Sequence, residues 1–243
     1  MKVFLDAGHG GKDPGALGNN LKEKDIALSV TLKVGEILKR HNIEVIYSRT
    51  TDVFLELSER TNLANNTNAD IFVSIHCNAA ENINAKGVET FSYPNSSKGT
   101  ALAKCIQDSI IANKVYTIDR GIKTANFAVL RQSNMPSALV ELAFITNVED
   151  SKILRDKQDE LAVSVAKGIL NYLGTRYIES KTGSKEEKQL DNLKIILHDK
   201  EIDVTGIYKD KTNYIPVRFL EMLGYSIKGQ GTNIVIEYKG EDK

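Results

Sequence analysis

Apolar residues in the first 175 positions fall into two kinds of stretch. Short apolar runs have the length and composition of buried strands, at residues 3–5, 43–47, 70–75, 88–93 and 138–142. Longer stretches repeat apolar residues at the i, i+4 spacing of amphipathic helices, at residues 25–40, 57–66, 99–111, 148–155 and 158–173. Strands that alternate with helices predict an α/β fold, in which a mostly parallel sheet is flanked by helices.

The pattern changes near residue 175. Residues 179–188 contain no apolar side chain, which is typical of a solvated linker. Beyond them, short alternating runs predict strands at 193–197, 201–204, 214–215 and 233–238, with one helical piece at 217–223. We therefore predict a first domain over residues 1–175, a linker over 176–189 and a second, smaller β-rich domain over 190–243.

Composition and charge narrow the class of protein. Of the 243 residues, 41% are hydrophobic and 26% are charged, as is usual for soluble globular chains. Lys and Arg together number 32, and so do Asp and Glu. Because nucleic-acid-binding domains carry a basic stripe or patch, we expect no nucleic-acid partner. No apolar run approaches the roughly 18 residues of a membrane span, so we expect no membrane insertion.

The start of the chain offers no export signal. Asp6 follows only three apolar residues. The apolar core of a secretory signal peptide needs about 7–15 residues. We therefore expect synthesis in the cytoplasm without a Sec-type signal peptide.

Cysteine and histidine are both scarce. The two cysteines, Cys77 and Cys105, form no C-x-x-C pair, which excludes a disulfide framework and a thiolate-rich zinc site, and we expect both in the core. Any metal would therefore be held by histidine and carboxylate side chains. Of the four histidines, His41 is expected at the end of a helix and His198 in a hairpin turn.

Three side chains of the first domain are predicted to meet at one edge of the sheet. His9 follows the first strand in a glycine-rich turn, His76 ends the third strand, and Glu23 lies just before a helix. In open α/β sheets, ligand sites gather at the carboxyl ends of the strands. Two imidazoles and one carboxylate are the ligand set of a catalytic zinc ion. Glu141 lies within an apolar strand, where an unpaired charge is costly, and it is our candidate for a general base.

Each of these residues also has an ordinary interpretation. His9 alone could be a surface residue, Glu23 a helix N-terminal acid, and Glu141 one half of a buried ion pair. The spacing matches no general zinc signature such as H-E-x-x-H, and the glycine-rich turn lacks the pattern of a phosphate or dinucleotide loop. Only the combination of the four residues favours a zinc hydrolase.

A series of segments spans nearly the whole first domain: LDAGHGGKDPGA at 5–16, EKDIAL at 23–28, RTTD at 49–52, LSER at 57–60, ADIFVSIHCNA at 69–79, GVET at 87–90 and VELAFITN at 140–147. In content and order they resemble the zinc-dependent N-acetylmuramoyl-L-alanine amidases of the type-3 family, found in bacterial autolysins and phage endolysins. The resemblance implies one zinc ion per chain on His9, Glu23 and His76, and a catalytic carboxylate at Glu141.

The substrate implied by the resemblance is peptidoglycan, cleaved at the amide between the lactyl group of N-acetylmuramic acid and L-alanine of the stem peptide. Zinc would activate a water molecule, and Glu141 would pass its proton to the leaving nitrogen. Asn126 and Arg131 are candidates for substrate contact, with a surface ion pair as the alternative for Arg131. Without an export signal, such an enzyme would act on the wall after release or lysis, as an endolysin or an autolysin.

Residues 190–239 resemble the stalk-type domain related to the N-terminal module of copper amine oxidases, through the segment NYIPVRFLEMLG at 213–224. That domain occurs in wall-associated proteins, so the resemblance implies wall binding or homo-oligomer formation. Two other functions stay open for the chain as a whole. One is a non-catalytic wall-binding or scaffold protein, and the other is a zinc peptidase that cuts a different peptidoglycan bond.

Overall fold

The computed structural model describes residues 1–115, 118–179, 188–197, 200–209, 212–214, 225–230 and 233–238. The chain divides into two compact units, Met1–Ile178 and Glu179–Lys243. Within the described residues, none of the helices has the length and apolar character needed to span a bilayer.

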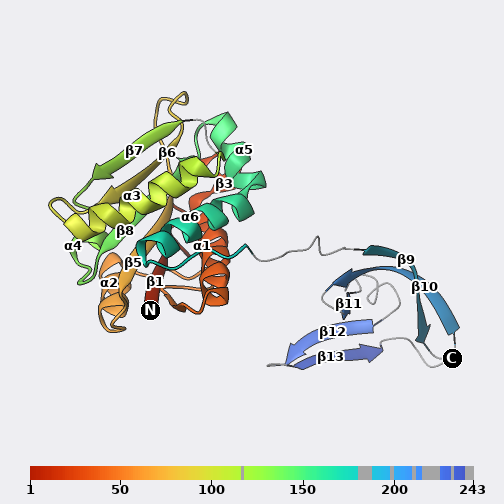
Figure 1. The fold of residues 1–243 in the computed structure, drawn as a ribbon. Coiled ribbons are helices and arrows are strands. Elements are labelled where there is room, and N and C mark those ends of the chain that lie inside the picture. Colours follow the sequence, from red (N-terminus) through yellow and green to blue (C-terminus); the bar gives the residue numbers. More distant parts are fainter. Residues whose placement is uncertain are drawn as a thin grey trace. The chain divides into compact units, whose positions relative to one another are not determined.

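The first unit is built on a six-stranded sheet with the order β4-β1-β5-β8-β6-β7 (Figure 1). The strands are β1 (Lys2–Ala7), β4 (Glu44–Tyr47), β5 (Ile71–Asn78), β6 (Val88–Ser92), β7 (Asp119–Thr124) and β8 (Ser137–Phe144). Neighbouring strands run parallel except β6 and β8, which are antiparallel. The predicted α/β fold with a mostly parallel sheet is thus confirmed.

Helices cover both faces of this sheet. Successive residues of a strand point to opposite faces, and strands with apolar residues at successive positions must therefore be covered on both. Val3 and Leu5 of β1 belong to the larger core, with residues of α1 (Glu23–Arg40), α3 (Ser97–Ala112) and α6 (Gln158–Tyr172). Phe4, between them, belongs to a smaller core with residues of α2 (Leu57–Asn65) and α4 (Ala128–Arg131). α6 packs against both α1 and α3, and α5 (Val148–Asp156) follows β8 (Figure 1).

The structure corrects the predicted positions of two site residues. β5 keeps its pairing with β8 beyond His76, across a bulge, and therefore continues through Cys77 to Asn78, so His76 lies inside the strand rather than at its end. Glu23 does not precede α1 but is its first residue, where the helix dipole favours an acid. Cys77 is buried in the larger core, as predicted, whereas Cys105 on α3 is only partly buried.

Other elements are confirmed or added by the structure. His41 is the C-cap residue of α1, as predicted. The hairpin of β2 (Leu17–Gly18) and β3 (Leu21–Lys22), the strand β7 and the helix α4 were not predicted. β7 was missed because it is an edge strand, and its sequence, Asp-Arg-Gly-Ile-Lys-Thr, contains only one large apolar residue. α4 was missed because its four residues are too few to show a helical period.

In the second unit, the elements among the described residues are all strands. β9 (Lys188–Leu197), β10 (Lys200–Lys209) and β11 (Thr212–Tyr214) form one antiparallel sheet, and β12 (Tyr225–Gln230) pairs with β13 (Asn233–Tyr238). The predicted helix at 217–223, the linker residues 180–187 and His198 lie outside the described residues.

Candidate metal centre

His9 lies in the turn that follows β1 and has a left-handed backbone, with φ of 57°. Its Nδ1 lies 2.8 Å from Asp13 Oδ2, and its Nε2 lies 3.0 Å from Glu23 Oε1. Because ionised carboxylates only accept hydrogen bonds, both ring nitrogens carry a proton and the ring is an imidazolium. Burial lowers the pKa of His9, but the Glu23 and Asp13 carboxylates outweigh burial and raise it to about 9.

Glu23 connects the two histidines and is almost fully buried. Its Oε1 lies 2.9 Å from His76 Nδ1 and accepts a hydrogen bond from the backbone N–H of Cys77. Its Oε2 accepts a hydrogen bond from the backbone N–H of Ala16 at 2.8 Å. Burial raises the pKa of Glu23, but His76 and His9 more than offset burial and hold this pKa well below its usual range. The carboxylate is therefore ionised, and both of its oxygens are fixed in place.

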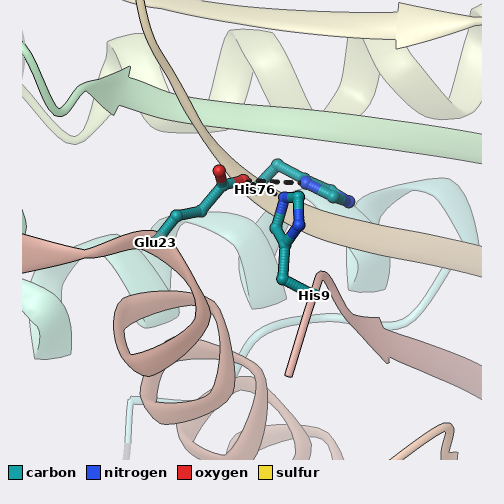
Figure 2. Close-up of side chains that lie close together, drawn as sticks. All are labelled: His9, Glu23 and His76. Atoms are coloured by element: carbon teal, nitrogen blue, oxygen red, sulfur yellow. Dashed lines mark hydrogen bonds and ion pairs between the residues drawn. The ribbon is translucent and has the colours of Figure 1, made fainter. Parts of the chain in front are cut away.

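His76 reaches the same point from β5. Its ring packs on the backbone of Gly8, where an added Cβ would lie 2.3 Å from His76 Cε1, so a larger residue at position 8 would displace the ring. The rings of His9 and His76 meet edge to face, with centroids 4.9 Å apart. Figure 2 shows both rings and the Glu23 carboxylate converging from β5, from the turn after β1 and from the start of α1.

These three side chains fit a zinc ion. One ligand atom from each of His9, Glu23 and His76 lies within 4.8 Å of the other two. Zinc bonds of about 2.0–2.2 Å in a tetrahedral arrangement place ligand atoms about 3.3 Å apart, which small side-chain shifts would reach. A divalent cation would replace the protons that these atoms share and would balance the charges of Glu23 and Asp13. Asp13 also orients His9 as carboxylates orient metal-bound histidines.

Glu141 lies on β8, directly across from His76 on β5 and from Glu89 on β6. Its Oε2 is buried without a hydrogen-bond partner among the described residues. Burial raises the pKa of Glu141 to about 7; His76 opposes this shift, and the charges of Glu23 and Glu89 add to it. A carboxyl group with a pKa near neutrality can both accept and donate a proton, as a general acid–base group must.

The three candidate ligands and Glu141 line one cavity of about 560 Å³, a size typical of small-molecule sites. Apolar side chains line another part of the cavity: Phe54, Leu57, Phe127 and Val129. Leu57 and Phe127 are exposed, although both are large and apolar. The cavity thus combines ionisable groups with an apolar wall that is open to a ligand.

Asn126 and Arg131 do not line this cavity. Arg131 Nη1 donates to Asn126 Oδ1 at 2.7 Å and to the Asn126 carbonyl, and both side chains are exposed. The pair spans α4 and its N-cap residue Phe127, and Phe127 and Val129 of this segment line the cavity. Their contact with substrate stays a prediction.

Arg49 was not predicted as a site residue, yet it connects two ligand-bearing segments. It is buried, and its Nη2 donates to the carbonyl of Gly8 at 2.7 Å and to the carbonyl of Lys24 at 2.9 Å. These residues are the chain neighbours of His9 and Glu23. A sequence pattern cannot distinguish a buried arginine that bonds to carbonyls from a surface arginine, so periodicity gave no signal here.

Arg60 fixes the same turn from α2. This arginine is 2% exposed; its Nη1 donates to Asp6 Oδ1 at 2.8 Å, and its Nη2 donates to the carbonyl of His9 at 2.6 Å. Ser74 Oγ donates to the other oxygen of Asp6. Burial would raise the pKa of Asp6, but Arg60 and Ser74 lower it below its usual value. The ion pair therefore holds the His9 backbone in its left-handed conformation.

Comparisons with known proteins identify the family of the first unit. A sequence model of a family described as N-acetylmuramoyl-L-alanine amidase matches residues 3–171. The sporulation-specific N-acetylmuramoyl-L-alanine amidase of Bacillus subtilis is 40% identical over 186 residues, which cover 76% of this chain and 71% of that protein. The endolysin of Bacillus phage SPP1 is 40% identical over 197 residues, which cover 78% of this chain and 71% of that protein.

Solved structures show the same relationship. The N-acetylmuramoyl-L-alanine amidase AmiC2 of Nostoc punctiforme superimposes with a TM-score of 0.69 at 40% identity, over 72% of this chain and 97% of that one. The catalytic domain of CwlV, an N-acetylmuramoyl-L-alanine amidase from Bacillus (Paenibacillus) polymyxa, gives 0.68 at 38% identity, over 72% and 99% of the two chains. The family match covers the unit that contains the candidate metal centre, and the chain belongs to the N-acetylmuramoyl-L-alanine amidase family.

Proposed function

We propose that this chain is a zinc-dependent peptidoglycan amidase that hydrolyses the bond between the lactyl group of N-acetylmuramic acid and L-alanine of the stem peptide. His9, Glu23 and His76 would hold one zinc ion, and Glu141 would act as the general base. The observation that carries the proposal is the single cavity that these four side chains line. Membership of the amidase family supports the choice of bond.

Each of these residues has a separate role in the proposed reaction. A bound zinc ion supplies Lewis acidity towards a carbonyl oxygen and lowers the pKa of a water molecule. Glu141 accepts a proton from the attacking water and then donates it to the nitrogen of the departing L-alanine. Burial raises its pKa to about 7 without bound metal, which makes this carboxyl a better proton donor than an exposed one. Asp13 keeps the proton on His9 Nδ1, so Nε2 is the nitrogen that would bind the metal.

Two other functions use parts of the same site. A non-catalytic wall-binding scaffold is disfavoured by Glu141, because a buried carboxylate oxygen without a partner destabilises a fold and has no use without chemistry. A zinc peptidase acting on another peptidoglycan bond would use the same four groups. The reaction products distinguish such a peptidase from the amidase.

Digestion of purified sacculi, followed by mass spectrometry of the products, tests the proposal. An amidase releases intact stem peptides with a free amino group on L-alanine and leaves the glycan strands whole. We expect complete chelation to stop the release and Zn²⁺ to restore it. Peptides cut within the stem would contradict the choice of bond, and full activity in verified metal-free protein would contradict the zinc centre.

The proposal extends to the second unit. The resemblance at residues 213–224 supports a role in wall binding or homo-oligomer formation. Removing residues 179–243 is expected to weaken binding to sacculi and to spare hydrolysis of soluble muropeptides. If the shortened protein binds sacculi as well as the full chain does, the wall-binding role is wrong.

A further inference from the structure

One buried carboxylate beside Glu141 holds two cations. Glu89 on β6 is 4% exposed and lies directly opposite Glu141 across the antiparallel pair of β6 and β8. Its Oε2 accepts hydrogen bonds from Arg120 Nε at 2.6 Å and from Lys123 Nζ, and its Oε1 accepts one from Asn78 Nδ2 at 2.6 Å. Burial raises the pKa of Glu89, but the two cations outweigh burial and keep it ionised. The cluster therefore carries one net positive charge.

This surplus charge is available to a ligand. One cation is enough to neutralise Glu89, and the side chains of Arg120 and Lys123 are 33% and 39% exposed. Arg120 stacks on the ring of Phe144 and binds Glu89 through Nε, while its two terminal nitrogens make no hydrogen bond to any described residue. Asp119, the acid next to Arg120 on β7, bonds instead to the side chain of Gln107 on α3.

The cluster lies next to the cavity and is connected to it through Asn78. Asn78 lines the cavity and donates to Glu89, so the two are in direct contact. The strand order places His76 on β5, then Glu141 on β8, then Glu89 on β6 and finally the two cations on the edge strand β7 (Figure 1). α3 packs against β6 on the face that carries Val88. Glu89 lies on the other face of β6, which α3 does not cover.

The proposed mechanism decides which part of the substrate lies over this cluster. Glu141 donates its proton to the leaving nitrogen, so the leaving peptide extends from Glu141 away from His9, Glu23 and His76. Adjacent strands are about 4.8 Å apart, which puts β7 about 10 Å from β8. An extended peptide covers about 3.3–3.6 Å per residue, so this distance corresponds to about three residues.

We propose that Arg120 and Lys123 bind a carboxylate on the second or third residue of the leaving peptide, and so make the enzyme selective for acidic stem peptides. The inference rests on the proposed function and names the substrate class of the same site. A carboxylate suits this pair because the planar arginine fork can donate two parallel N–H bonds to it, while the lysine adds a second positive charge.

The test compares two soluble muropeptides that differ in one group, a free carboxylate or a carboxamide on the second peptide residue, and a second such pair altered at the third residue. We measure kcat and KM for the full-length zinc-loaded enzyme, for Arg120→Gln and for Lys123→Gln. Each variant leaves Glu89 one cation, so the fold keeps its buried ion pair. Lys104→Gln on α3 is the matched control, since it removes the same charge from an exposed pair with Asp108.

For the wild-type enzyme we expect KM to be about tenfold lower with the carboxylate of one pair, because hydrogen bonds to charged groups are typically worth that much or more. Arg120→Gln should remove most of this preference with little change in kcat, and Lys104→Gln should keep it. A loss of folding would affect both substrates equally and would not remove the preference. If the wild type shows no preference in either pair, or Arg120→Gln keeps it, the inference is wrong while the amidase stands. If neither muropeptide is cleaved, the proposed function itself fails.

Discussion

Replacing Asp13 by Asn should change how zinc binding depends on pH. In the metal-free structure, His9 lies between Asp13 and Glu23 and is an imidazolium with a pKa of about 9. Zinc must displace the proton on His9 Nε2, so protons compete with the metal at every pH below 9. Asp13→Asn removes one of the two charges that raise this pKa, and the competition then ends at a lower pH.

The size of the effect follows from this pKa. For the wild-type protein, displacement of one proton makes zinc affinity rise about tenfold per pH unit, or about 100-fold between pH 7 and pH 9. Burial lowers the pKa of His76, but Glu23 raises it above its usual value, so a proton displaced from His76 makes this rise steeper. At pH 9 the variant should bind zinc about 10–100-fold more weakly, because a carboxylate that orients a metal-bound histidine is typically worth that much. Towards pH 6.5 the difference in zinc affinity between the two proteins should shrink, because His9 is protonated in a smaller fraction of the variant molecules.

Competition with a chelator of known affinity, measured from pH 6 to 9.5, gives both curves. Calorimetry in two buffers of different ionisation heat counts the protons released at pH 7, which should be fewer for Asp13→Asn than for the wild type. Asp108→Asn, an exposed carboxylate on α3, is the control and should follow the wild-type curve. Parallel curves for the wild type and Asp13→Asn would refute the reasoning, because they would show that Asp13 does not set the protonation of His9.

Three further predictions follow from the site. Arg49→Lys keeps the charge but lacks the fork that bonds to two carbonyls, so zinc affinity should fall at least tenfold while unfolding of the metal-free protein changes less; equal losses in both would show a purely structural role. Gly8→Ala should displace the His76 ring, and metal analysis should find well under one zinc per chain; a full complement would contradict the packing argument. Glu141 must be ionised to accept a proton, and its pKa of about 7 in the metal-free protein falls when a dication binds. The rate should therefore decline as the pH drops below that lowered pKa, and a rate that rises towards pH 5 would contradict the assignment of the base.

The sheet and its large helices could be predicted because buried elements have apolar residues in continuous runs or at helical spacing. β5 and β8 appear as apolar runs, and α1 and α6 repeat apolar residues on one face, since each of these elements contributes to the larger core. β7 has no such apolar pattern, because it lies at the edge of the sheet and its residues are exposed or half-buried. The antiparallel direction of β6 was also beyond prediction, because apolar patterning carries no strand direction.

Four of the residues that the sequence singled out are brought together by the topology, while Asn126 and Arg131 lie outside the cavity and the residues that orient the four were missed. His9, Glu23, His76 and Glu141 stand out as polar groups at turns or within apolar runs, and such groups are rare enough to notice. Arg49 acts through hydrogen bonds from a guanidinium to carbonyls, and these depend on how distant segments pack rather than on local pattern.

The most direct test of the proposed zinc amidase is the Glu141→Gln variant, measured for zinc content and for turnover of a soluble muropeptide in the same preparation. The substitution keeps the shape of the side chain and leaves His9, Glu23 and His76 intact. We predict about one zinc per chain and a kcat lowered by about 10²–10⁴-fold, the usual contribution of a general base. His76→Ala, in contrast, should lose the metal. A Glu141→Gln protein that retains near-normal turnover would contradict the assignment of Glu141 and with it the mechanism proposed for this site.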